Sequence, residues 1–248
     1  MTAILSLSGL RKSFGALVVT DDLSLDLFPG ECHALIGPNG AGKTTLIHQI
    51  SGTLSPDAGR IMFDGRDVTA LPPHARASAG LGRTFQITSI IPGLSVRENV
   101  ALAAQAVDGS SYRFFGRAAH ERRLNERADE ALALIGLSDR SDRLAGALSH
   151  GEKRALELAV AIAMRPKALM LDEPMAGMGR DESARLVETL GRLKADYPLL
   201  LVEHDMDAVF ALADRVSVLV YGKIIATGTP DEVRANAEAR AAYLGEDA

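Results

Sequence analysis

The chain has 248 residues, with 32 acidic and 27 basic side chains, a formal net charge of −5 and one cysteine, Cys32. This acidic balance argues against nucleic acid as the main partner, because proteins that bind nucleic acid concentrate basic residues. A single cysteine cannot form an internal disulfide, which fits a reducing compartment such as the cytosol. Apolar runs stay below the roughly 18 residues of a membrane-spanning helix, so the chain is not expected to cross a membrane by itself.

The N-terminal third is predicted to form strands that lead into a glycine-rich loop. Residues 4–14 and 17–28 alternate apolar and polar side chains, as half-buried strands do. The apolar run 32–37 predicts a further strand that ends at the loop, and residues 43–52 predict a helix directly after it. This order of strand, glycine-rich loop and helix is the context that a phosphate-binding loop requires.

The pattern changes in the middle of the chain and changes back afterwards. Residues 95–165 are rich in alanine and leucine at helical spacing, and apolar runs such as ALMLDEP, PLLLVEH and VSVLVYG then return with helical stretches between them. Strands that alternate with helices predict an α/β fold with a mainly parallel sheet. The central block predicts an inserted helical subdomain.

The glycine-rich loop, GPNGAGKTT, matches the complete G-x-x-x-x-G-K-[ST] motif. In such a loop the backbone N–H groups and the start of the following helix face the phosphates of a nucleotide. Lys43 is expected to reach the β- and γ-phosphates, and the hydroxyl of Thr44 is expected to hold Mg²⁺. The predicted ATP-binding residues of this loop are Gly37, Pro38, Asn39, Gly40, Ala41, Gly42, Lys43, Thr44 and Thr45.

The ends of later strands supply further groups for a hydrolytic site. Parallel strands present their carboxyl ends at the sheet edge where such a loop also lies. Asp172 is expected to help coordinate Mg²⁺, and Glu173 to act as general base toward the attacking water or to orient it. His204 is expected to contact the γ-phosphate, and the amide of Gln86 to touch both Mg²⁺ and the attacking water.

The stretch ALSHGEKRALEL, residues 147–158, has the pattern of a helix start. Ser149 and Glu152 have the spacing of a capping box. Gly151 in the first turn costs about 1 kcal/mol relative to alanine, so its presence indicates a purpose other than helix formation. A serine hydroxyl and a bare glycine at the positive end of a helix predict a second phosphate-binding position.

Together these motifs resemble the ATP-binding subunit of an ABC transporter over essentially the whole chain. The phosphate loop, TFQ, LSHGE, LMLDEP and VEHD occur in the order and relative spacing of that family. The resemblance implies a single domain over 1–248 with ATP and Mg²⁺ as cofactors. Its fold would be a P-loop NTPase (RecA-like) α/β core with an antiparallel β subdomain. That core is expected at about 1–86 and 166–248, and an inserted α-helical subdomain at about 87–165.

The resemblance also implies roles across a dimer interface. In this family the signature motif of one subunit binds the γ-phosphate held by the other subunit of a head-to-tail dimer. Its counterpart here is the set Leu148, Ser149, His150, Gly151 and Glu152. His150 and Glu152 depart from the commoner LSGGQ, while Gly179 stands where most members carry an aspartate in the loop between the two sites. Phe14 occupies the position of an aromatic residue that stacks on adenine.

Several stretches, among them LSHGEKR, EPMAGM and the terminal AYLGED, resemble the ATPases of branched-chain amino acid uptake systems. Urea, amide and aromatic-acid importers share the pattern. This resemblance implies ATP-driven import at the cytoplasmic face of the inner membrane. The implied partners are a second, identical or similar ATPase subunit, two membrane permease subunits and, indirectly, a periplasmic solute-binding protein. Residues 87–100 lie in the block that is expected to supply the docking surface for the permeases.

Other functions stay open at the level of the sequence. The homodimeric ATPases of lipopolysaccharide export keep a similar YLGE ending. A non-transport ABC ATPase of DNA repair or ribosome action would share the motifs, but such chains usually carry coiled coils, tandem units or basic surfaces. A P-loop kinase or GTPase would explain the phosphate loop but not LSHGE, and the guanine-reading N-K-x-D motif is absent. A protein that only binds nucleotide, without hydrolysing it, would require Glu173 to have no catalytic role.

Overall fold

The structure, a computed structural model, describes residues 2–83, 90–107 and 122–244. Gln86, to which the sequence assigns a contact with the metal and the attacking water, lies outside the described residues. So do residues 87–89 of the predicted docking segment and the end of the AYLGED stretch.

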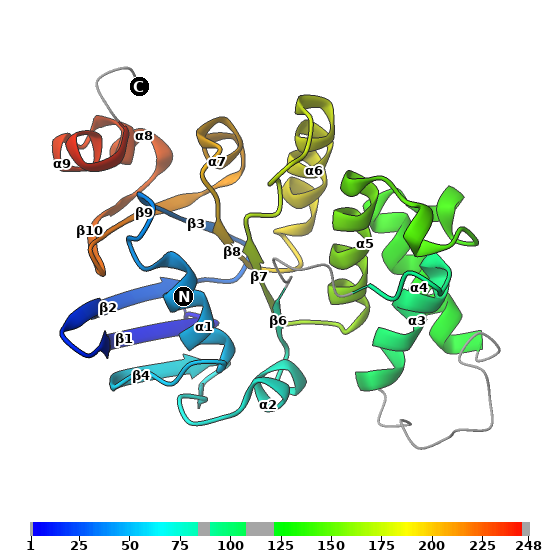
Figure 1. Ribbon diagram of the computed structural model, residues 1–248, viewed down its shortest axis with the longest axis horizontal. Coiled ribbons are helices and arrows are strands. Elements are labelled where there is room, and N and C mark those ends of the chain that lie inside the picture. Colours follow the sequence, from blue (N-terminus) through cyan, green and yellow to red (C-terminus); the bar gives the residue numbers. More distant parts are fainter. Residues whose placement is uncertain (1, 84–89, 108–121, 245–248) are drawn as a thin grey trace.

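The described strands form two sheets (Figure 1). The four-stranded sheet is antiparallel and has the order β2 (Leu17–Leu27), β1 (Leu5–Phe14), β4 (Ala58–Phe63) and β5 (Arg66–Asp67). The six-stranded sheet has the order β10 (Lys223–Gly228), β9 (Arg215–Val220), β3 (Cys32–Ile36), β8 (Leu199–Val202), β7 (Ala168–Asp172) and β6 (Leu81–Arg83). All neighbours in this second sheet are parallel except β10, which pairs antiparallel with β9.

The carboxyl ends of three parallel strands meet at one edge of the six-stranded sheet. The register places Leu35 of β3 beside Val202 of β8, and Val202 beside Asp172 of β7. The phosphate loop follows β3, Glu173 follows β7 and Glu203 follows β8. The topology therefore delivers the predicted phosphate and water-activating groups to the same edge.

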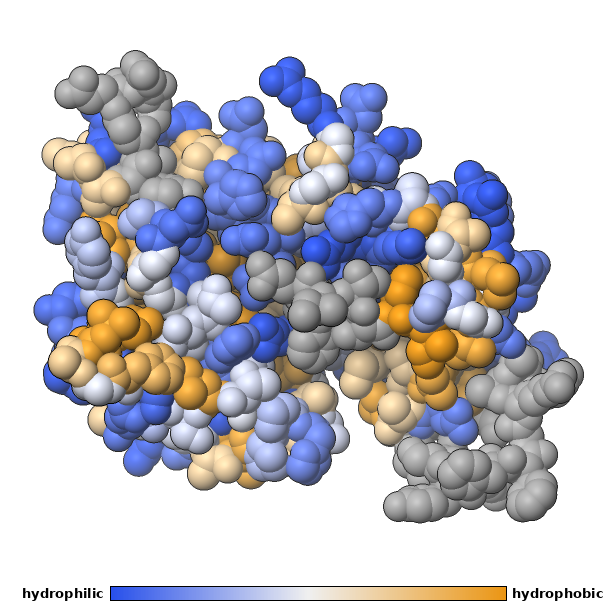
Figure 2. Space-filling view, in the orientation of Figure 1, coloured by the Kyte–Doolittle hydropathy of each residue, from blue (hydrophilic) through white to orange (hydrophobic). Residues whose placement is uncertain are grey.

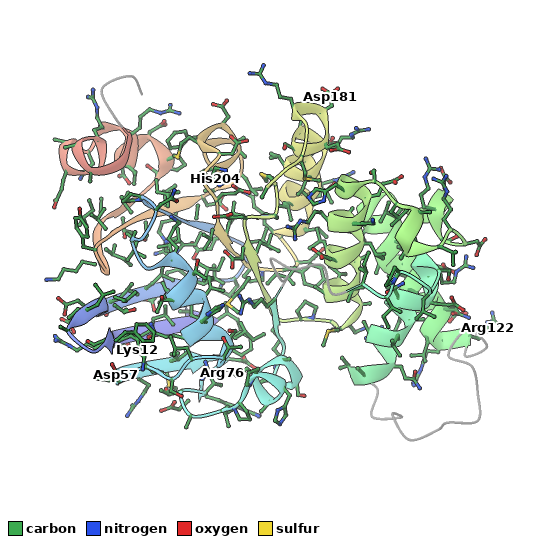
Figure 3. All side chains as sticks on the ribbon, viewed as in Figure 1. Lys12, Asp57, Arg76, Arg122, Asp181 and His204 are labelled. Atoms are coloured by element: carbon green, nitrogen blue, oxygen red, sulfur yellow. The ribbon has the colours of Figure 1, made fainter. Side chains whose placement is uncertain are left out.

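Helix α1 (Lys43–Ser51) starts at the phosphate loop and is fixed at its far end by an arginine. The buried guanidinium of Arg76, from α2 (Pro73–Ser78), donates to the carbonyls of Gln49 at 2.6 Å and Ile50 at 2.7 Å. Figure 3 labels Arg76 beneath α1. These bonds satisfy carbonyls that the last turn of a helix leaves open. They hold α1 in place, and with it the helix start that faces the phosphate loop.

Three helices pack together on the right of Figure 1: α3 (Val96–Val107), α4 (Arg122–Ile135) and α5 (His150–Ala163). Their apolar faces share one buried cluster with β7, β8 and α6 (Arg180–Leu193). This arrangement confirms the predicted α/β fold with an antiparallel subdomain and an inserted helical part. The predicted subdomain boundaries stay a prediction, since residues 84–89 lie outside the description.

The C-terminal part of the chain adds the short helices α7 (Met206–Leu212), α8 (Pro230–Ala235) and α9 (Ala237–Ala239). Across the three described stretches, no helix has the length and apolar character that crossing a bilayer requires.

Candidate functional site

The phosphate loop between β3 and α1 leaves the start of α1 open. Gly42 caps the helix with φ 110° and offers no side-chain hydrogen bond, so the first N–H groups of α1 stay available to an anion. A Cβ atom on Gly42 would lie 2.5 Å from the carbonyl oxygen of Val19, in a conformation that L side chains rarely adopt. Only glycine fits this junction between the loop and β2.

The side chain of Lys43 binds to the backbone of the phosphate loop. Its ammonium group donates to the carbonyl oxygens of Gly37 at 2.6 Å and Pro38 at 3.0 Å. Burial lowers the pKa of Lys43, and the carboxylates of Glu173 and Asp172 act in the opposite direction. The ammonium group therefore already lies at the loop that is predicted to bind phosphate.

The end of β7 has the donors that a magnesium ion requires. Asp172 is buried, and its Oδ2 atom has no hydrogen-bond partner. Arg83 of β6 lies 3.6 Å away, and burial raises the pKa of Asp172 while Arg83 opposes the shift. The side chain of Thr44, in the first turn of α1, is exposed. A carboxylate oxygen that accepts no hydrogen bond and an exposed hydroxyl are oxygen ligands of the kind that Mg²⁺ prefers, so these residues fit the ion.

Glu173 leaves the sheet in an unusual backbone conformation. Its φ of 48° lies in the left-handed region, which a non-glycine residue adopts only when its surroundings impose it. The N–H group of Glu173 donates to the carbonyl oxygen of Val202 at 2.8 Å. This bond to the neighbouring strand fixes where the Glu173 side chain leaves the sheet edge.

A buried carboxylate that the sequence interpretation missed joins the two strand ends. Glu203 is fully buried, and its oxygens accept hydrogen bonds from the N–H groups of Met175 and His204, both at 2.9 Å. The sequence placed His204 at the end of a strand, but β8 ends at Val202, and the N–H groups of His204 and Asp205 donate to Glu203 instead of to a neighbouring strand. His204 is exposed beside α7, where Figure 3 labels it. The only sequence signal for Glu203 was an acidic residue directly after four apolar ones.

Phe14 lies at the tip of the β1–β2 hairpin and is 51% exposed. With Leu17 and Val18 it forms the apolar patch that Figure 2 shows over this hairpin. The close approach of Val19 to Gly42 places the hairpin beside the start of α1. An exposed aromatic ring on a hairpin whose second strand contacts the phosphate loop has the chemistry of a platform for a nucleotide base.

The signature motif forms the start of α5 as predicted. Ser149 Oγ accepts from the N–H of Glu152 at 3.2 Å, and a Glu152 carboxylate oxygen accepts from the N–H of Ser149 at 2.8 Å. This confirms the capping box, and the Ser149 N–H lowers the pKa of Glu152. Leu148 is buried, whereas Ser149 and His150 are exposed at the helix start.

The predicted residues lie in two groups. The phosphate loop and the strand ends share one sheet edge, while the signature motif begins a helix beyond β7. In Figure 1, α1 and the start of α5 lie on opposite sides of β7. The chain therefore has two separate helix starts that carry the residues predicted to bind phosphate, one at α1 and one at α5.

Comparison with known proteins agrees with this geometry. Residues 20–176 match the family described as ABC transporter, and residues 223–248 match the family described as branched-chain amino acid ATP-binding cassette transporter. The high-affinity branched-chain amino acid transport ATP-binding protein LivG of Escherichia coli (strain K12) is 36% identical over 250 residues, which cover 98% of each chain. The lipopolysaccharide export system ATP-binding protein LptB of Haemophilus influenzae is 35% identical over 245 residues, again 98% of each chain.

Among solved structures, an ATP-binding cassette of an ABC transporter in its ADP conformation is similar over 99% of this chain and 100% of its own. The TM-score is 0.87 at 30% sequence identity. Family match, full-length identity and shared fold lead to one conclusion. The chain belongs to the ABC transporter family, as an ATP-binding and ATP-hydrolysing subunit.

Proposed function

We propose that this chain powers the import of branched-chain amino acids or similar small polar solutes. The observation that carries the proposal is the match of residues 223–248 to the branched-chain amino acid family, because the identities to LivG and LptB are nearly equal and do not separate import from export. Lipopolysaccharide-type export by a homodimer is the second candidate, favoured by the full-length similarity to LptB.

In the proposed mechanism the sheet edge binds and hydrolyses ATP. Lys43 holds the β- and γ-phosphates, and Phe14 stacks on adenine. Thr44 and Asp172 would hold Mg²⁺, which when bound neutralises charge on the phosphates. Glu173 accepts a proton from the attacking water, or orients that water, while His204 contacts the γ-phosphate. Gln86 is assigned to the metal and the same water from the sequence alone.

The signature motif is proposed to act on the ATP of a second subunit. Ser149 and His150 are exposed at the start of α5, which leaves this end of the helix open to a phosphate from a second subunit, while Gly151 in the same turn is buried against α6. In a head-to-tail dimer the phosphates of each ATP touch both chains. ATP then favours the closed dimer because it has a higher affinity for that state, and hydrolysis removes the bridge.

Two permease subunits are the proposed membrane partners, with this chain at the cytoplasmic face of the inner membrane and a periplasmic solute-binding protein as an indirect partner. Ile91 is 44% exposed and Leu144 is 56% exposed. Their segments run together, since Ala145 N–H donates to the Leu94 carbonyl at 2.9 Å and Ser95 pairs with Leu144. Figure 2 shows apolar residues on the helical side of the molecule, which suits the docking of a permease helix.

A charged side chain at the signature motif tests the shared site. Ser149→Arg in the Glu173→Gln background is expected to abolish ATP-dependent dimerisation, because the arginine fills the position of the partner's phosphate. ATP affinity is expected to stay unchanged, since Ser149 does not belong to the chain's own phosphate loop. Sedimentation velocity with and without ATP and Mg²⁺ measures the first effect, with Ser8→Arg on β1 as the matched control. Dimer formation by the Ser149→Arg protein would refute the role of the signature motif.

The transported solute is tested in cells that carry the whole transporter. Replacing the chromosomal copy by Glu173→Gln is expected to abolish uptake of radiolabelled leucine, because the proposed transporter depends on hydrolysis. Growth and surface lipopolysaccharide are measured in the same cells. Normal leucine uptake together with loss of surface lipopolysaccharide would contradict the import proposal and support the export alternative.

A further inference from the structure

A carboxylate of α6 lies directly against the signature glycine. If Gly151 carried a Cβ atom, that atom would lie 2.6 Å from Oε1 and 3.0 Å from Oε2 of Glu182. Real Cβ atoms do not approach a carboxylate so closely, so only glycine fits at this position while Glu182 is in place. The two residues also line a cavity of about 430 Å³ together with Ser149 and Glu152.

The loop after Glu173 also makes contacts near the start of α5. The N–H of Gly179 donates to Glu182 Oε2 at 3.3 Å, in the first turn of α6. On the other side of the loop, His150 Nε2 lies 3.3 Å from the carbonyl oxygen of Ala176. The segment after Glu173 therefore contacts α5 directly through His150 and indirectly through Glu182, which lies against Gly151.

The charge on Glu182 is not neutralised by a neighbouring side chain. Within the described residues, no cation lies within ion-pair distance of this carboxylate. Arg140, which lines the same cavity, pairs with Glu152 at 3.0 Å, and Arg185 Nε donates to the Asp181 carbonyl at 3.1 Å. What remains to stabilise the carboxylate is the positive potential at the starts of α5 and α6. The proposed function assigns the start of α5 to the partner's γ-phosphate.

We infer that Glu182 is a positioning residue that competes with the partner's γ-phosphate for the start of α5. In the single chain its carboxylate stabilises the helix start; in the dimer the arriving phosphate repels it, because two anions share one positive helix end. Displacement of Glu182 moves Gly179, and hence the loop that leads back to Glu173. The partner's ATP would then adjust the position of the water-activating carboxylate within the same chain. This inference rests on the proposed function of the signature motif.

The test compares ATP-dependent dimerisation of full-length Glu173→Gln with and without Glu182→Gln. Glutamine has the same size as glutamate and can still accept the Gly179 N–H, but it carries no charge. The dimer dissociation constant at saturating ATP and Mg²⁺ is expected to fall by roughly threefold for each of the two sites. The matched control is Asp181→Asn, which removes a charge from the same helix turn at the exposed outer end of α6 (Figure 3). ATP affinity of the monomer is expected to be equal in all variants.

The outcomes separate a charge effect from simple packing. Unchanged or weaker dimerisation of the Glu182→Gln protein overturns the inference, because a purely structural contact gains nothing from loss of charge. If the Glu173→Gln parent stays monomeric with ATP, the proposed dimer of two copies of this chain is wrong. The inference about Glu182 is then tested in the monomer. The readout is then the amide resonance of Gly151 during titration with inorganic phosphate. A larger shift in the Glu182→Gln protein supports the inference, and an equal shift overturns it.

Discussion

Replacing Glu173 by glutamine is expected to lower ATP turnover by about a hundredfold or more, the usual contribution of a general base, while ATP binding is retained. An amide cannot accept the proton of the attacking water, yet it has nearly the same size as the carboxylate. The substitution leaves the backbone of this left-handed position and its N–H bond to the Val202 carbonyl intact. The loss should therefore appear in catalysis and not in folding.

Phosphate release under saturating ATP measures turnover, and fluorescence of a labelled nucleotide measures binding. Glu188→Gln is the matched control, since Glu188 is exposed on α6 and the substitution removes the same charge. Near-normal turnover in the Glu173→Gln protein would show that another group activates the water.

Replacing Lys43 by alanine is expected to weaken ATP binding by at least about tenfold, the value of one hydrogen bond between charged groups. The ammonium group already lies within the phosphate loop, bonded to the Gly37 and Pro38 carbonyls. Bound phosphates would take over these donors, whereas an alanine leaves them only the backbone N–H groups of the loop and α1.

Equilibrium titration with a fluorescent ATP analogue measures the affinity. Lys167→Ala is the control, because Lys167 is a surface lysine paired with Asp64 and lies in neither phosphate position. An unchanged dissociation constant for the Lys43→Ala protein would refute the phosphate role of this lysine.

Features that depend on neighbours in the chain were predictable from the sequence. The phosphate loop, the helix after it and the capping box of Ser149 and Glu152 each arise within a few consecutive residues, and the structure has all three. The parallel sheet followed from the alternation of strands and helices. Gly151 was noticed because a glycine weakens a first helical turn, but its structural reason needed the fold.

Contacts between distant segments were not predictable. Glu203 was missed because one of its partners, Met175, follows a different strand, so the bond between the two strand ends depends on the fold. Arg83 beside Asp172 and Glu182 beside Gly151 likewise depend on how β6, β7, α5 and α6 pack. A single sequence gives the spacing of these residues along the chain but not their distances in space.

The two hydrogen bonds from Lys43 to the carbonyls of its own loop have a consequence for nucleotide binding. A loop with several glycines loses conformational entropy when it becomes ordered around a ligand. Here the bonds from Lys43 to two carbonyls of the loop restrict the conformations that the loop can adopt, which lowers the entropy that ordering it would cost. A nucleotide whose phosphates accept from Lys43 would then require this one side chain to change acceptors, at a smaller entropic cost than ordering the whole loop.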